Sequence, residues 1–216
     1  MLPEDRFTRS FRDEAFSFFT HLGGAILGVL ALVVLVVRAS GPLAIAAVSI
    51  YGATLIVMFA SSALHHVAYR EDGALRKIDM TAIYLFIAGT YTPVCLLALP
   101  HSWGWSLLII VWALAGGGIA LRWALPKTPR WVTVGLYLGL GWIGVVTLVP
   151  LAQSVAWKGV ALLVAGGIIY SMGAVVYARE RPDPWPRVVG HHGLWHIFVL
   201  FGALSHFALV WLVSAA

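Results

Sequence analysis

The chain has 216 residues, of which 61% are hydrophobic and 11% are charged, and its mean hydropathy is +0.91. A soluble domain carries about 25% charged residues, so this composition excludes a soluble globular protein. The formal net charge of +5 could suggest a nucleic-acid partner. We expect none, because the basic residues are grouped in short breaks between apolar runs. The single cysteine, Cys95, excludes an internal disulfide.

Seven apolar runs of membrane-spanning length follow one another along the chain. A helix needs about 20 apolar residues to cross a bilayer, and these runs lack the alternation of β-barrel strands. We therefore predict an all-α membrane protein, a single seven-helix transmembrane domain over residues 1–216, whose first helix is retained rather than cleaved as a signal peptide. The predicted helices occupy about 17–38, 42–64, 79–99, 103–123, 131–151, 157–178 and 193–213.

The basic residues gather at one side of the predicted bundle. Of the 14 Lys and Arg residues, all but Arg38 and Lys158 precede the first helix or lie at or between the adjoining ends of helices two and three, four and five, or six and seven. Cytoplasmic loops are enriched in Lys and Arg. We therefore predict a multi-pass protein of the cell membrane, with a cytoplasmic N-terminus and an external C-terminus.

The seventh run begins with "HHGLWHIFVLFGALSH", residues 191–206, which places four histidines in an otherwise apolar segment. Polar groups inside a membrane are costly and mark functional sites. His192 and His196 are four residues apart, so their side chains lie about 6 Å apart on one helix face. The zinc-binding histidines of metalloproteases have the same spacing. His206 lies about 15 Å farther along the helix, too distant to share an ion.

A further ligand is expected from the second helix, which ends in "SSALHH", residues 61–66. A catalytic zinc ion usually takes three protein ligands and leaves a fourth position for water. His65 and His66 are both candidates, because the spacing from the two preceding serines does not separate them. Asp79, at the head of the third predicted helix, would orient the zinc-bound water or accept its proton.

Other polar residues at the same predicted end have simpler interpretations beside the functional ones. Glu14, Ser17 and His21 lie on one face of the first helix. We interpret Glu14 as a favourable charge at a helix N-terminus rather than as a catalytic acid. His21 either supports a metal ligand or bridges two helices. His101 and His206 are expected to pack or to lie at the membrane interface.

The proposed site residues have structural alternatives as well. His192 and His196 could hydrogen-bond to lipid headgroups or to neighbouring carbonyl groups. Asp79 could cap the third helix or pair with a nearby basic residue, and Ser62 could hydrogen-bond to its own helix backbone. The presence of all these groups at one membrane level favours a metal site.

Three motifs together resemble the hemolysin III family, which is related to the adiponectin and progestin receptors and, more distantly, to the alkaline ceramidases. They are Ser-x-x-x-His ending the second helix, Asp opening the third, and His-x-x-x-His in the seventh. The resemblance extends from Glu14 to His206. It implies a Zn²⁺ site in which His66, His192 and His196 are the ligands and Asp79 and Ser62 the catalytic residues, with Asp79 acting on the zinc-bound water.

This sequence departs from the family pattern at two positions. His65 precedes His66, and His191 precedes His192, where tyrosine is expected. Either member of each doublet is therefore a candidate ligand, and the other a candidate donor to the site.

Three functions are compatible with such a site. The first is a zinc-dependent hydrolase of a lipid amide or ester, for which the family resemblance suggests ceramide-like amides. The second is a non-enzymatic receptor or regulator of membrane state, in which zinc is structural. The third is a pore-forming cytolysin, against which the sequence argues, because a secreted toxin must stay soluble before it inserts. Membrane lipid and zinc are thus the expected partners.

Overall fold

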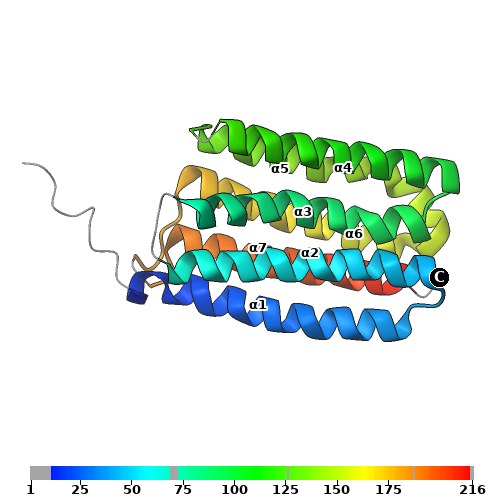
Figure 1. The fold of residues 1–216 in the computed structure, drawn as a ribbon, viewed down its shortest axis with the longest axis horizontal. Helices are drawn as coiled ribbons and strands as arrows, with labels where there is room; N and C mark the ends of the chain where they lie inside the picture. The colour runs from blue at the N-terminus through cyan, green and yellow to red at the C-terminus, as the bar shows by residue number, and fades with distance from the viewer. Residues whose placement is uncertain (1–10, 69–72, 126, 187, 215–216) are drawn as a thin grey trace, which may run out of the picture.

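The computed structural model describes residues 11–68, 73–125, 127–186 and 188–214, which form a helical bundle (Figure 1). This confirms the predicted all-α class. The elements are α1 (Phe11–Arg38), α2 (Pro42–Val67), α3 (Ala74–Leu97), α4 (His101–Ala124), α5 (Arg130–Trp142), the 3-10 helix η2 (Ile143–Thr147), α6 (Leu148–Arg179) and α7 (Gly190–Val213).

Among the residues that the structure describes, six helical stretches are long and apolar enough to cross a membrane, so the chain is a multi-pass membrane protein. Five of them correspond to single predicted helices. The remaining stretch, Arg130–Arg179, is 50 residues long and covers the predicted fifth and sixth helices. It is interrupted inside α6, where Val155 (φ −122°, ψ 21°) and Ala156 (φ 59°, ψ −177°) leave the helical conformation. This interruption falls between the predicted helices at 131–151 and 157–178.

Several helices begin earlier than the apolar runs that predicted them. α1 begins at Phe11, α3 at Ala74 and α7 at Gly190, because their first turns carry polar residues that hydropathy leaves out but that suit a membrane surface. The N-cap residue of α3 is Gly73, so Asp79 lies in the second turn. Asp79 therefore does not cap this helix.

The helices bring distant parts of the chain to one end of the bundle. α2 packs against α1 and α3, and α7 packs against α6 and also contacts α1 and α3. In Figure 1, the end of α2 lies at the same end as the starts of α1, α3 and α7. The polar residues singled out in these four helices are thereby gathered at one level.

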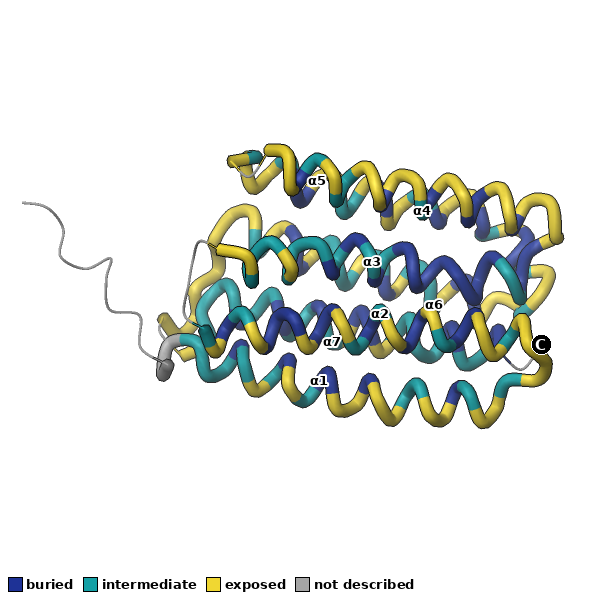
Figure 2. Tube along the Cα trace, viewed as in Figure 1, coloured by how far each residue is buried: buried dark blue, intermediate teal, exposed yellow. Residues whose placement is uncertain are grey.

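α3 lies at the centre of this arrangement. Of the six apolar stretches it has the largest buried share and α1 the smallest, and Figure 2 shows exposed residues along the outer faces of α1 and α4. The approach of α2 to α3 depends on Gly89, where a Cβ atom would lie 2.0 Å from Thr54 Oγ1. This close packing places Ser62 of α2 near Asp79 of α3.

Candidate metal centre

Three histidine side chains from two helices meet at the end of the bundle just described. His66 lies in the last turn of α2, and His192 and His196 lie in the first two turns of α7. Their Nε2 atoms are 3.2 Å (66 to 196), 3.3 Å (66 to 192) and 3.1 Å (192 to 196) apart. These atoms are close enough to share one metal ion. His66 and His196 are buried, and His192 is half-buried.

The other member of each histidine doublet lies outside this group. The ring of His65 is tilted against that of His66, with a centroid separation of 5.3 Å. The backbone N–H of His191 donates to Asp183 Oδ1 at 3.0 Å and so holds the start of α7. Helix geometry turns adjacent residues to different faces, so only one histidine of each doublet points at the shared centre.

Glu14 connects α1 to this histidine group. Its Oε2 atom lies 2.7 Å from Nδ1 of His66. An ionised carboxylate only accepts hydrogen bonds, so Nδ1–H of His66 is the donor, and Nε2 of the neutral ring keeps its lone pair. That lone pair faces the other two histidines. Glu14 thus fixes both the tautomer and the orientation of His66.

His21 covers the group from α1. Its ring stacks on that of His196, with a centroid separation of 3.7 Å and an interplanar angle of 20°. On another side it meets the ring of Phe59 edge to face at 5.0 Å. Only 3% of His21 is exposed, and its nitrogens have no hydrogen-bond partner among the described residues. Its contact is therefore one of packing, and it bridges α1 and α7.

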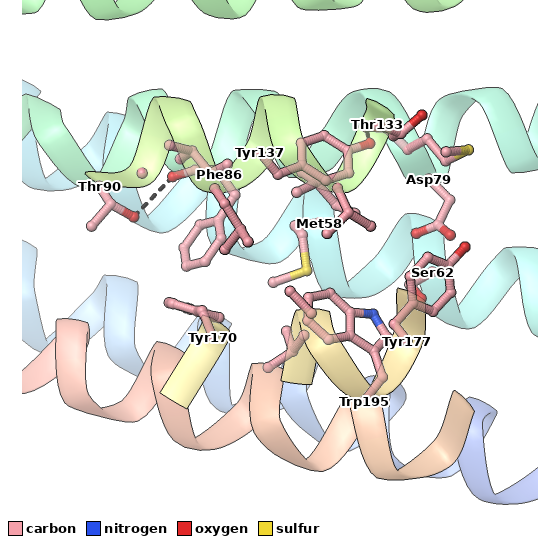
Figure 3. Close-up of a pocket in the computed structure, with 18 of the residues that line it drawn as sticks. Met58, Ser62, Asp79, Phe86, Thr90, Thr133, Tyr137, Tyr170, Tyr177 and Trp195 are labelled. Atoms are coloured by element: carbon pink, nitrogen blue, oxygen red, sulfur yellow. Dashed lines mark hydrogen bonds between the residues drawn. The ribbon is translucent and has the colours of Figure 1, made fainter. Parts of the chain in front are cut away.

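Asp79 and Ser62 face each other where α3 passes α2. Ser62 and Asp79 lie close together in Figure 3, and Ser62 acts as a side-chain hydrogen-bond partner of the Asp79 carboxylate. The neighbouring Ser61 instead donates to the carbonyl oxygen of Met58 in its own helix at 3.1 Å. Ser61 therefore makes the hydrogen bond to its own helix backbone that was considered for Ser62. Ser62 lies beside the Asp79 carboxylate instead.

A cavity of about 700 Å³ adjoins these residues. His192, His196, Ser62 and Asp79 line one part of it, and most of the remaining lining is apolar or aromatic, from α3, α5, η2, α6 and α7. Figure 3 shows Phe86 and other aromatic side chains along its length. A polar centre therefore opens onto a space suited to an apolar molecule.

Comparison with known sequences assigns the family. The family model described as "Haemolysin-III related" matches residues 9–207. The chain belongs to the hemolysin III family. It is 35% identical over 210 residues to the protein named Hemolysin-3 from Bacillus cereus, covering 95% of this chain and 93% of that protein.

Two further similarities extend the comparison of this hemolysin III family member. It is 35% identical over 204 residues to the Hemolysin-3 homolog of Bacillus subtilis (strain 168), covering 92% of this chain and 93% of that protein. It is 25% identical over 169 residues to the monocyte to macrophage differentiation factor of Homo sapiens, covering 75% of this chain and 68% of that protein.

Glu14 is the residue of this hemolysin III site whose role the sequence interpretation missed. It was expected to act as a helix-end charge, yet it contacts the ring of His66, which is 52 positions away. The shared face of Glu14 and His21 on α1 was the available signal. His206, by contrast, is a packing residue, as expected. Its Nε2 lies 3.3 Å from the carbonyl oxygen of Leu163.

Proposed function

We propose that this protein is a zinc-dependent hydrolase that cleaves an amide or ester bond of a membrane lipid. His66, His192 and His196 hold the ion, and Asp79 and Ser62 complete the catalytic site. The observation that carries the proposal is the convergence of three Nε2 atoms within 3.3 Å of one another beside a mainly apolar cavity.

The separations within the histidine group fit zinc. Zn–N bonds of about 2.0–2.1 Å in tetrahedral geometry place the ligand nitrogens about 3.3 Å apart, and the observed separations are 3.1–3.3 Å. A carboxylate behind a ligand histidine, as Glu14 lies behind His66, is the usual support of such a ligand. Without a cation the three nitrogens cannot all pair, because one ring N–H satisfies only one neighbour.

The remaining residues supply the parts of a hydrolytic site. Bound zinc provides a Lewis acid for the substrate carbonyl and lowers the pKa of a bound water. Asp79 accepts the proton of the attacking water. Ser62 donates to the Asp79 carboxylate and orients it. The cavity holds the apolar part of the substrate and excludes bulk water.

The same proposal includes seven membrane spans, with the histidine group near the cytoplasmic side. A continuous helix over Arg130–Arg179 would be about 75 Å long, whereas the hydrocarbon core is about 30 Å thick. The interruption at Val155 and Ala156 supports a turn between two spans.

Labelling of single cysteines placed at Arg179 and Lys158 tests this topology. Arg179→Cys should be accessible from the cytoplasm and Lys158→Cys from outside, and the reverse result would contradict it.

Asp79→Asn tests the hydrolase directly. Purified wild-type protein in lipid micelles should hydrolyse a ceramide-like amide or a matched ester, and the variant should lose about 100-fold or more of that activity. The variant should keep its zinc, because Asp79 is outside the ligand group. Unchanged turnover would remove Asp79 as the base. A wild-type protein that binds zinc and hydrolyses neither lipid would contradict the hydrolase and favour a regulator with structural zinc.

Membrane lysis is a second candidate function, and the name Hemolysin-3 of the Bacillus cereus relative favours it. Dye release from liposomes containing the purified protein distinguishes the two. A hydrolase should release dye only in proportion to lipid turnover, so Asp79→Asn should abolish release. Release by zinc-free protein, unaffected by Asp79→Asn, would support lysis as the primary activity.

A further inference from the structure

Basic residues line the cavity at the end where the histidines meet. The described lining residues include five Lys and Arg side chains and one acidic side chain, that of Asp79. These five come from three different helices and one loop: Arg76 and Lys77 of α3, Arg122 of α4, Lys127 of the α4–α5 loop and Arg130 of α5. Cationic side chains thus outnumber acidic ones on the described lining of this part of the cavity.

The direction of Arg122 is not explained by membrane topology alone. Cytoplasmic ends of helices are rich in arginine, and such residues ordinarily extend toward water, as the exposed Arg179 at the end of α6 does. Arg122 is instead turned into the bundle, with 8% of its surface exposed, while the adjacent Trp123 is 48% exposed. Charged residues buried in a membrane protein mark candidate functional sites, and Arg122 lies on the cavity wall.

Aromatic rings contact two of the other basic side chains that line the cavity. The Nζ atom of Lys77 lies 5.4 Å from the centre of a Trp123 ring, and the guanidinium carbon of Arg130 lies 5.0 Å from that of Tyr177. Arg130 also pairs with Glu180. Cation–π contacts of this kind restrict the positions of the cationic groups. The basic wall is thus partly ordered before any ligand arrives.

We propose that the cavity binds a lipid whose headgroup carries a phosphate, with Arg122 as its principal contact. A guanidinium binds phosphate through paired N–H···O hydrogen bonds, and the apolar lining beyond it accommodates the hydrocarbon chains. This inference specifies the substrate class of the proposed hydrolase, and in that respect it rests on the proposed function. Headgroup binding itself can be measured without any turnover.

Binding of ether-linked lipids tests the proposal, since they contain no ester to hydrolyse. Zinc-loaded wild-type protein in micelles is titrated with a dialkyl phosphatidic acid, with the matching dialkylglycerol that lacks phosphate, and with inorganic phosphate. Quenching of tryptophan fluorescence is the readout, because Trp123 and Trp195 line the cavity. The phosphatidic acid should bind about tenfold or more tightly than the dialkylglycerol, and inorganic phosphate more weakly than the phosphatidic acid.

Variants of Arg122 identify the contact. Arg122→Gln should lose the preference for the phosphate-bearing lipid, Arg122→Lys should keep part of it, and the exposed control Arg179→Gln should keep all of it. Should Arg122→Gln fail to fold, the double variant Arg76→Gln and Lys77→Gln tests the same wall and should weaken the preference. The proposal would be overturned by equal binding of the two lipids by wild type, or by binding of free phosphate as tight as that of the phosphatidic acid. It would also be overturned if a folded Arg122→Gln protein kept the full preference for the phosphate-bearing lipid. Intact preference in a protein without hydrolytic activity would overturn only the hydrolase.

Discussion

The Glu14 carboxylate lies 2.7 Å from Nδ1 of His66 and so ties the start of α1 to the end of α2. Loss of such a support behind a metal ligand typically lowers metal affinity about 10–100-fold. Glu14→Ala should therefore weaken zinc binding by that factor, as measured by competition with a chromogenic chelator. Glu180→Ala, which removes an exposed carboxylate from the same end of the bundle, should leave the affinity unchanged. Equal affinities in wild type and Glu14→Ala would show that this contact does not support a metal ligand.

The neighbouring histidines of α2 give a matched pair of variants. Nε2 of His66 lies within 3.3 Å of both α7 nitrogens, whereas His65 lies beside the group. His66→Ala should lose stoichiometric zinc, and His65→Ala should retain it, as measured by elemental analysis after gel filtration. The opposite pattern would assign the ligand to His65.

The two serines of the same helix separate a catalytic contact from a structural one. A hydrogen bond to a charged group is worth about 1.5–3 kcal/mol, so Ser62→Ala should slow lipid hydrolysis about 10- to 100-fold. Ser61→Ala should leave the rate near that of wild type, because the Ser61 hydroxyl bonds to its own helix. Both variants should keep zinc. Equal rates in the two variants would remove Ser62 from the catalytic site.

The packing of α2 on α3 should depend on Gly89. A Cβ atom there would lie 2.0 Å from Thr54 Oγ1 and 2.9 Å from Thr54 Cβ, and overpacking of this kind typically costs about 1–3 kcal/mol. Gly89→Ala should lower Tm, measured by a thermal-shift assay in detergent. Thr54→Ala in the same chain should restore part of the loss, because it removes the nearest atom. An unchanged Tm in Gly89→Ala would show that the two helices can separate freely.

The sequence was sufficient for the helical class and for placing His192 and His196 on one face of a helix. Apolar runs long enough to cross a bilayer are a direct signal, and the i, i+4 spacing of His192 and His196 places them on one face without any tertiary information. The choice between His65 and His66 came only from family resemblance. The rotation of α2 about its own axis decides which ring faces α7, and tertiary packing sets that rotation.

Other features could not be predicted, because they depend on contacts between distant residues. The bond from Glu14 to His66 requires α1 to pack beside α2, and the cavity is lined by residues of every helix from α1 to α7 and of η2. The inward direction of Arg122 is likewise invisible in a pattern that treats every arginine at a helix end alike. The early starts at Ala74 and Gly190 were missed because hydropathy discounts polar first turns.

The most direct test of the candidate metal centre is the zinc content of the purified protein. Elemental analysis should find about one zinc ion per chain in wild type, a content near zero in His192→Ala, and the wild-type content in His191→Ala, whose ring lies outside the group. Wild-type protein without zinc after equilibration with the metal, or His192→Ala with the full wild-type content, would contradict the account.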